Sequence, residues 1–120
     1  MASIDSNPFL SIQINSTTQK ATVVVVAQVS FAPGESPLTS RVDCRVLGDD
    51  VVRDDFLFGY PTHFFNDPGA AQSVRFEKGD VPLSQLNEDL IGADEIVGEV
   101  TLRPGGGMAV SKRTNVFQLR

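Results

Sequence analysis

The sequence has little of the side-chain chemistry on which most catalytic and metal sites depend. It contains one cysteine, Cys44, one histidine, His63, and no tryptophan. A single cysteine cannot form an intramolecular disulfide, and a single histidine excludes a histidine-rich metal centre. A serine triad would need His63 as its base, and no Gly-x-Ser-x-Gly motif accompanies it. We therefore expect no enzyme and no catalytic residues, with His63 at the surface or a strand edge and Cys44 as a small buried side chain.

Long apolar runs and an excess of basic charge are also missing. The longest apolar run, residues 21–27, is too short to cross a bilayer, and the first residues do not resemble a secretion leader, so the compartment stays unknown. The sequence has ten Lys and Arg and fifteen Asp and Glu, which gives a net charge of -5. This charge repels phosphate backbones, so nucleic acid is not an expected partner. The one basic pair, Lys112-Arg113, is typical of a solvated strand edge.

What the sequence does contain is a series of short β patterns. Apolar residues alternate with polar ones in several segments, residues 21–31 are rich in β-branched side chains, and Pro and Gly clusters separate the segments. We predict an all-β fold, a single antiparallel β-sandwich of seven or eight strands, with a small closed β-barrel as the alternative. Residues 1–8 are expected to form a flexible N-terminal arm and residues 9–120 the single sandwich domain.

The same patterns predict details that a structure can test. Val74 and Phe76 are expected to point inward, as are Ile96, Val100 and Leu102. Lys78-Gly79-Asp80 is expected to form a turn, and residues 81–86 a short strand or one helical turn. Residues 108–119 are predicted to close the chain as one strand.

An acidic segment occurs twice. A shift of 39 lays residues 47–59 on residues 86–98, with four identical positions, namely Leu47/Leu86, Asp50/Asp89, Asp55/Asp94 and Gly59/Gly98. Carboxylates, carbonyls and waters are the ligands that calcium takes, with tolerance for irregular geometry. The candidate ligands in the two segments are Asp49, Asp50, Asp54, Asp55, Asn87, Glu88, Asp89, Asp94 and Glu95. Asp and Asn also favour tight turns for backbone reasons alone, so two solvated turns are the alternative.

The second segment carries a family resemblance. Asp94-Glu-Ile-Val-Gly-Glu-Val-Thr-Leu102 resembles Asp-Asp-Phe-Ile-Gly-Glu-Val-x-Leu, which follows the third calcium loop in the calcium-dependent lipid-binding β-sandwich domains of the protein kinase C and synaptotagmin kind. Asn87-Glu88-Asp89 stands where that family has Asp-x-Asp, and the resemblance covers about 17 of 120 residues. It implies an eight-stranded sandwich with Asp89 and Asp94 as calcium ligands and Asn87 in place of one carboxylate.

These observations lead to a hypothesis about function. We expect a non-enzymatic binding or assembly module that acts through a protein partner or self-assembly, with calcium as the candidate ion of the acidic segments and no other cofactor. Calcium-dependent membrane recruitment is the alternative, and membrane contact is expected only in that case. A small carboxylate-dependent hydrolase is the remote alternative, since acidic residues are abundant.

Overall fold

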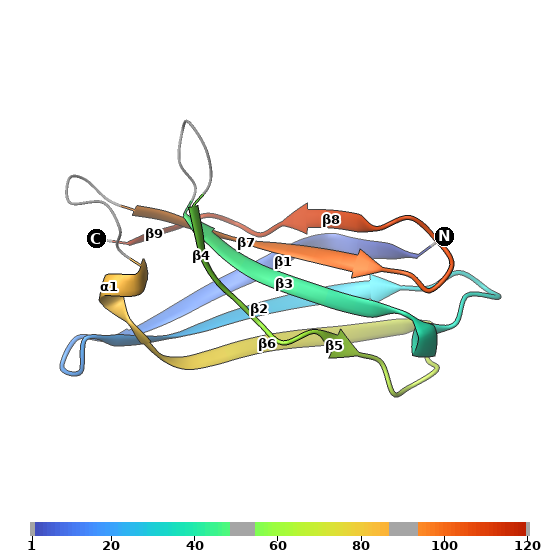
Figure 1. The fold of residues 1–120 in the computed structure, drawn as a ribbon, viewed down its shortest axis with the longest axis horizontal. Coiled ribbons are helices and arrows are strands. Elements are labelled where there is room, and N and C mark those ends of the chain that lie inside the picture. Colours follow the sequence, from blue (N-terminus) through green and yellow to red (C-terminus); the bar gives the residue numbers. More distant parts are fainter. Residues whose placement is uncertain (1, 49–54, 87–93, 120) are drawn as a thin grey trace.

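Two antiparallel sheets pack face to face over one hydrophobic core (Figure 1). The computed structural model describes residues 2–48, 55–86 and 94–119. Sheet A has the order β1-β2-β6, from β1 (Ser3–Asn15), β2 (Lys20–Ser30) and β6 (Ala71–Pro82). Sheet B has the order β4-β3-β7-β8, from β4 (Asp55–Gly59), β3 (Arg41–Gly48), β7 (Asp94–Arg103) and β8 (Val110–Arg113). This arrangement confirms the antiparallel sandwich, and among the described strands neither sheet closes into a barrel.

Short elements complete the two sheets. β5 (His63–Phe64) pairs with β3 on the side of β4, and β9 (Phe117–Leu119) pairs with β7 on the side of β8. A 3-10 turn η1 (Pro37–Thr39) precedes β3, and a single helical turn α1 (Leu83–Leu86) follows β6, as one of the two predictions for residues 81–86 had it. No helix in the described ranges has the length and apolar character needed to cross a membrane.

The core follows the alternation in the sequence. β2 is the central strand of sheet A, and its inward side chains Val23, Val25 and Val29 are fully buried while Val24 and Val26 are half-buried on the outer face. The unbroken valine run therefore lies at a sheet centre, where β-branched side chains pack well on both faces. The predicted inward positions are also confirmed as buried, namely Cys44, Val74, Phe76, Ile96, Val100 and Leu102.

Aromatic rings close one side of the sandwich, between β4-β5 and β6. The Phe58 and Tyr60 ring centroids lie 5.5 Å apart, those of Tyr60 and Phe76 5.4 Å, and those of His63 and Phe65 5.1 Å. The Tyr60 hydroxyl donates to the carbonyl oxygen of Val23 at 2.8 Å, which satisfies its polar end. Burial raises the pKa of Tyr60 above its ordinary value. His63 lies on the edge strand β5, as predicted, where it is half-buried against these rings.

Two polar residues close the opposite side, and we call Thr114 and Asn115 the latch. The Gly98 N–H donates to Thr114 Oγ1 at 2.8 Å, and the Thr114 N–H donates to the Gly98 carbonyl at 2.9 Å. The Asn115 side chain accepts from the Leu10 N–H at 2.8 Å and donates to the Leu10 carbonyl at 3.1 Å. The latch therefore joins β7 of sheet B to β1 of sheet A.

The latch also divides the last predicted strand. Residues 108–119 form two strands, β8 and β9, instead of one. The pairs Glu99↔Arg113 and Ile96↔Phe117 enclose one more residue on the β8-β9 side than on β7, which is the count of a β-bulge. This extra residue lets Asn115 leave the ladder and turn its side chain toward β1.

The N-terminal segment differs from the predicted flexible arm. β1 begins at Ser3, and Ser3, Ile4 and Asp5 pair with the end of β2. The register shifts between Asp5 and Phe9, and Pro8 lies in this irregular stretch, where its missing N–H breaks no regular ladder bond. Ile4 is 2% exposed, so burial of an apolar side chain fixes a segment that its polar composition marked as loose.

The predicted turn at Lys78-Gly79-Asp80 is likewise a bulge within β6. The strand runs without a break from Ala71 to Pro82, and its register against β2 shifts between Ala21 and Val23. Asp80 has a φ of 56°, a conformation that Asp tolerates both in turns and in bulges. The residue types are right for either structure, and pairing with β2 selects the bulge.

Candidate functional site

The predicted calcium ligands fall mostly outside the described residues. Those outside are Asp49, Asp50, Asp54, Asn87, Glu88 and Asp89. Asp55 and Asp94 are the first residues of β4 and β7. Glu95 is exposed, and its Oε1 accepts from Gln118 Nε2 at 3.5 Å. Within the described ranges, no group of three His, Cys, Asp or Glu side chains is arranged to hold a metal ion.

The strand register brings the end of β3, the start of β4 and the start of β7 together at one end of sheet B. Gly48, the last residue of β3, pairs with Asp55 of β4 on one side and with Ile96 of β7 on the other. The segment between β3 and β4 and the segment that enters β7 are therefore attached to neighbouring strands. The repeat in the sequence did not specify this neighbourhood, because it depends on which strands pair.

The outer face of sheet B carries a second candidate site, which sequence reasoning missed. Its outward side chains fall into rows across β3, β7 and β8, with Arg45 opposite Glu99 and Glu99 opposite Arg113 in one row. Asp43, Thr101 and Ser111 make the next row, and Arg41 lies opposite Arg103 in the third. We call this surface the arginine face, and it consists of Arg41, Asp43, Arg45, Glu99, Thr101, Arg103, Ser111 and Arg113.

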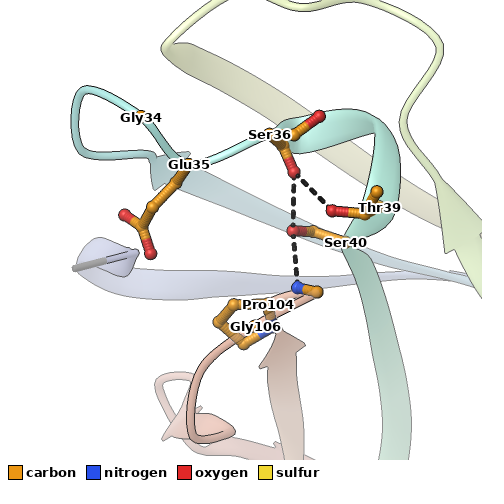
Figure 2. Close-up of a pocket in the computed structure, with 8 residues that line it drawn as sticks. Gly34, Glu35, Ser36, Thr39, Ser40, Pro104 and Gly106 are labelled. Atoms are coloured by element: carbon orange, nitrogen blue, oxygen red, sulfur yellow. Dashed lines mark hydrogen bonds between the residues drawn. The ribbon is translucent and has the colours of Figure 1, made fainter.

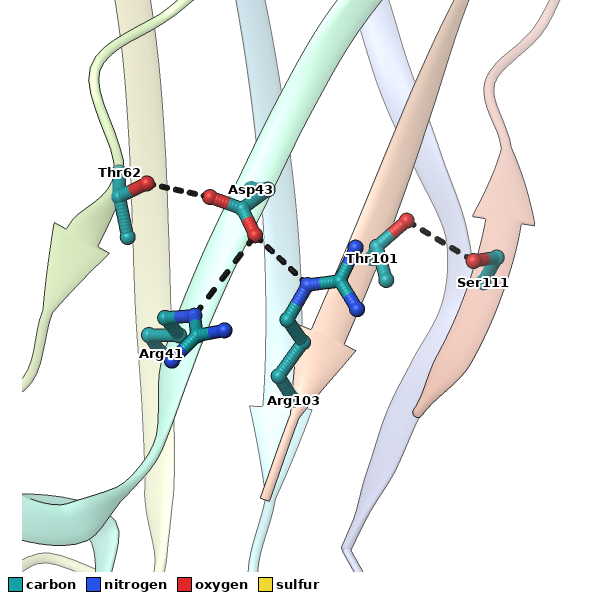
Figure 3. Close-up of polar contacts among 6 residues, drawn as sticks. All are labelled: Arg41, Asp43, Thr62, Thr101, Arg103 and Ser111. Atoms are coloured by element: carbon teal, nitrogen blue, oxygen red, sulfur yellow. Dashed lines mark hydrogen bonds and ion pairs between the residues drawn. The ribbon is translucent and has the colours of Figure 1, made fainter. Parts of the chain in front are cut away.

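Each carboxylate of the arginine face lies between two arginines. Arg45 Nε donates to Glu99 Oε1 at 2.8 Å, and Arg113 Nε lies 3.6 Å from Glu99 Oε2. Arg103 Nε donates to Asp43 Oδ2 at 2.8 Å. Arg41 Nε lies 4.0 Å from the same oxygen (Figure 3). The face is therefore built from two arginine–carboxylate–arginine groups, each with a surplus of one positive charge.

Asp43 is ionised at neutral pH in this setting. Partial burial pushes the pKa of its carboxyl up, but the hydroxyl of Thr62 and the guanidinium groups of Arg103 and Arg41 outweigh burial and bring the pKa below its ordinary value of 3.8. Thr62 donates to Asp43 Oδ1 from the connection between β4 and β5 (Figure 3). The carboxylate is thus held from both sides, and it holds its two arginines in place.

A shallow hollow of about 430 Å³ lies between the two charged groups. Thr101 and Ser111 are in its lining, and their hydroxyl oxygens are 2.8 Å apart (Figure 3). Ala109 lines it as well, while Arg45 and Glu99 on one side and Arg103 and Asp43 on the other provide the charge. The hollow therefore has small side chains in the middle and guanidinium groups at both ends.

A second hollow, of about 440 Å³, lies between η1 and the connection from β7 to β8 (Figure 2). The hydroxyls of Thr39 and Ser40 donate to the Ser36 carbonyl at 3.1 and 3.2 Å, and the Gly105 N–H donates to Ser40 Oγ at 3.2 Å. A Cβ at Gly105 would overlap Thr39, so only glycine allows this approach. The polar groups here hold two loops together, and we assign this hollow a structural role.

Glu35, beside the same hollow, also holds chain segments. Its Oε1 accepts from the Ala32 N–H at 2.7 Å and its Oε2 from the Ala2 N–H at 3.0 Å. The hydrogen bond from Ala32 is the main cause that lowers the pKa of this carboxyl. Glu35 thereby ties the start of β1 to the loop after β2.

Cys44 has no features of a reactive thiol. It is 4% exposed, and burial raises its pKa to about 12, with a smaller contribution from the charge of Glu99. A thiol with this pKa is almost fully protonated at neutral pH, so the structure confirms the predicted small buried side chain.

Comparison with known proteins leaves the family open. No protein-family model matches the chain, and no curated protein sequence matches it. A solved structure with partial similarity is that of a Bordetella pertussis protein provisionally named ApaA. The two chains share 11% sequence identity, and the match covers 99% of this chain and 90% of the Bordetella chain with a TM-score of 0.39. A TM-score this low does not establish a shared fold, so the fold assignment rests on the two sheets themselves.

Proposed function

We propose that the protein is a non-enzymatic binding module that presents the arginine face to a protein partner. The observation that supports this proposal is the charge of the surface. Four arginines and two carboxylates give the face a surplus of two positive charges, although the whole chain has a net charge of -5. Opposite charge on a partner would raise the rate and selectivity of association.

The energetics of the face also favour a role in binding over one in stability. Exposed ion pairs contribute only about 0–1 kcal/mol each, because solvent screens them and the side chains lose entropy. Arg41 and Arg103 lie directly opposite each other, and like charges in that position destabilise a sheet. The Asp43 carboxylate between them offsets part of this repulsion, so the two arginines together add little to stability.

A pair of matched substitutions tests the proposal. Ser111→Tyr places a large ring in the hollow, whereas Ser73→Tyr places the same ring on the outer face of sheet A. Ser73 accepts a hydrogen bond from Gln28, as Ser111 shares one with Thr101, so the two variants lose similar contacts. We expect partners captured from an extract of the source organism to be lost with Ser111→Tyr and retained with Ser73→Tyr. Unchanged capture by Ser111→Tyr would reject the arginine face as the docking surface.

Calcium in the acidic segments is a second proposal, supported by their attachment on either side of Gly48. An ion bound only by the folded protein raises stability by RT ln(1 + [L]/Kd), which is about 2.7 kcal/mol at a hundredfold excess over Kd. We expect a higher thermal midpoint in millimolar calcium than in chelator, with a smaller gain in Asp50→Asn and Asp94→Asn. Equal midpoints would remove calcium in that affinity range. Calcium-dependent sedimentation with anionic liposomes is the measurement that would support membrane recruitment.

A further inference from the structure

The two outer strands of sheet A differ in how their free edges are covered. On β1, the Asn115 side chain takes both the N–H and the carbonyl of Leu10, and the register breaks near Pro8. β6 is the other outer strand, and Figure 1 shows it at the lower side of sheet A, opposite β1. Because an uncovered edge is a template for one more strand, the free side of β6 is a candidate interface.

The hydrogen bonds between β2 and β6 identify the backbone groups on that free side. The Phe31 N–H donates to the Ala70 carbonyl at 2.7 Å, just beyond the start of β6. Hydrogen-bonded pairs alternate with non-hydrogen-bonded pairs along an antiparallel ladder, so the even-numbered residues of the range 72–78 direct their N–H and carbonyl groups to β2. The backbone groups of the odd-numbered residues 73–77 therefore point away from β2. Within the described ranges, no hydrogen bond reaches these outward groups.

The side chains beside these outward groups carry opposite charges. Arg75 and Glu77 are exposed on the outer face of sheet A, and Arg75 Nη2 donates to Glu77 Oε1 at 2.7 Å. Charges of a single sign on an edge strand would repel a second copy of the chain and so protect the edge. An arginine and a glutamate two residues apart do not have this effect, because an antiparallel copy can place each of them opposite the other.

One register of two antiparallel β6 strands achieves this pairing. When Phe76 lies opposite Phe76 of the second copy, Arg75 lies opposite Glu77 and Glu77 opposite Arg75. A shift of one strand by two residues in either direction brings two Arg75 or two Glu77 side chains together, and like charges opposite each other destabilise a sheet. Arg75 and Glu77 also have outward backbone groups, so each pair can exchange both of its backbone hydrogen bonds. The charges and the backbone therefore select the same register.

We infer that a second copy of the chain pairs with β6 in antiparallel orientation, with Phe76 at the two-fold axis. The paired segment, residues 74–78, lies in the part of β6 that follows β2 without a register shift. The two copies of sheet A then form one continuous sheet of six strands, three from each copy. The two-fold axis is perpendicular to this sheet, so both arginine faces point to the same side. This inference goes beyond the proposed function, because the dimer presents the arginine face twice.

Sedimentation velocity at low salt tests the dimer at protein concentrations from about 1 μM to about 1 mM, the range of weak association. We expect the wild-type chain to change from monomer to dimer within this range. Arg75→Glu and Glu77→Arg each turn both ion pairs into like-charge pairs, so each should raise Kd at least about tenfold. Lys20→Glu makes the same change of charge as Arg75→Glu at an exposed position of the same sheet, and it is the control with unchanged Kd. A wild-type chain that stays monomeric throughout would overturn the inference.

A mixture of the two variants tests the register. When Arg75→Glu and Glu77→Arg are mixed in equal amounts, each acidic side chain of one copy lies opposite a basic one of the other, so a mixed dimer should form. The double variant Arg75→Glu/Glu77→Arg restores both opposite-charge pairs and should dimerise about as strongly as the wild type. Thermal midpoints show that the variants fold. If the folded variants fail to form the mixed dimer, the register is wrong and the inference is overturned.

Amide hydrogen exchange of the wild-type chain tests the backbone pairing without any substitution. As the dimer forms, the amides of Arg75 and Glu77 should exchange more slowly, because they gain hydrogen bonds across the two-fold axis. The Phe76 amide is directed to β2 and should be protected in dilute and concentrated protein alike. Exchange at Arg75 and Glu77 that does not depend on protein concentration would overturn the pairing through β6.

Two further outcomes would assign a different contact. If a dimer forms that Arg75→Glu leaves intact and Arg103→Gln abolishes, the copies associate through the arginine face, and the inference is overturned. If the wild-type chain is a monomer that captures another protein, and Arg75→Glu abolishes the capture, the edge of β6 binds a strand of that protein. This result would also overturn the second copy as the occupant.

Discussion

Gly98 has so little space around its α-carbon that a single added methyl group tests the packing of the latch. A Cβ at Gly98 would lie 3.0 Å from Thr114 Cγ2 and 3.2 Å from Val25 Cγ2. Both atoms are in the closely packed space between the sheets, and overpacking of this kind costs about 1–3 kcal/mol. With a urea m-value of about 2 kcal/mol/M, we expect Gly98→Ala to lower the unfolding midpoint by roughly 1 M with no change in m.

The repeat supplies the control. Gly59 occupies the equivalent position in the first segment, and a Cβ there would meet its nearest atoms at ordinary distances of 3.7–3.9 Å. Because glycine weakens a strand through its backbone entropy, Gly59→Ala is expected to be neutral or stabilising by up to about 1 kcal/mol. The two alanine variants should therefore differ in sign or clearly in size.

A double-mutant cycle locates the cause. Thr114→Ser removes Cγ2, keeps the hydroxyl that accepts from the Gly98 N–H, and costs about 1 kcal/mol for the lost methyl group. Combined with Gly98→Ala, it should recover part of the loss, with a coupling of at least about 0.5 kcal/mol. Additive effects, or equal effects of Gly98→Ala and Gly59→Ala, would refute the packing described for the latch.

Three further predictions concern other described residues. Tyr60→Phe removes the hydrogen bond from the Tyr60 hydroxyl to the Val23 carbonyl and is expected to cost about 1 kcal/mol in urea unfolding; an unchanged midpoint would contradict the hydrogen bond. With a pKa of about 12 against an ordinary 9.0, Cys44 should react with a thiol reagent about a thousandfold more slowly in the native protein than in urea, and rapid native labelling would contradict its burial. Because the pKa of Asp43 is lowered on folding, its contribution to stability is present above pH 3.8 and is lost as the pH falls through the folded pKa, so Asp43→Asn should destabilise at neutral pH and progressively less as the pH falls below 3.8.

The sequence predicts well which way each strand residue faces, because that property is local. Alternation over a few residues is enough to place Val42, Cys44 and Val46 inward and to place Arg41, Asp43 and Arg45 outward. Alternation does not predict which strands lie next to each other in a sheet. Arg45 meets Glu99 across 54 positions, and no local pattern specifies that pairing. The arginine face could therefore be seen only once β3, β7 and β8 were known to be neighbours.

Residue preferences also fail to predict the local structure where two different structures favour the same residue types. Gly79 and Asp80 suit a turn and a bulge equally, since both use conformations with positive φ. The segment before Phe9 has a polar composition, yet burial of Ile4 fixes it in β1. The acidic segments were found by their repeat, while the common attachment beside Gly48 required the pairing of three strands.

The bonds between Asn115 and Leu10 have a consequence for how the chain folds. They join residues 105 positions apart, so all of the chain between Leu10 and Asn115 must be present before they can form. During synthesis, the N–H and carbonyl of Leu10 on the edge of β1 cannot form these two hydrogen bonds until Asn115 has left the ribosome. An unpaired strand edge is a template for intermolecular pairing. Slow synthesis of the segment that contains Asn115 would therefore favour aggregation of the nascent chain through β1, long after most of the core residues have been made.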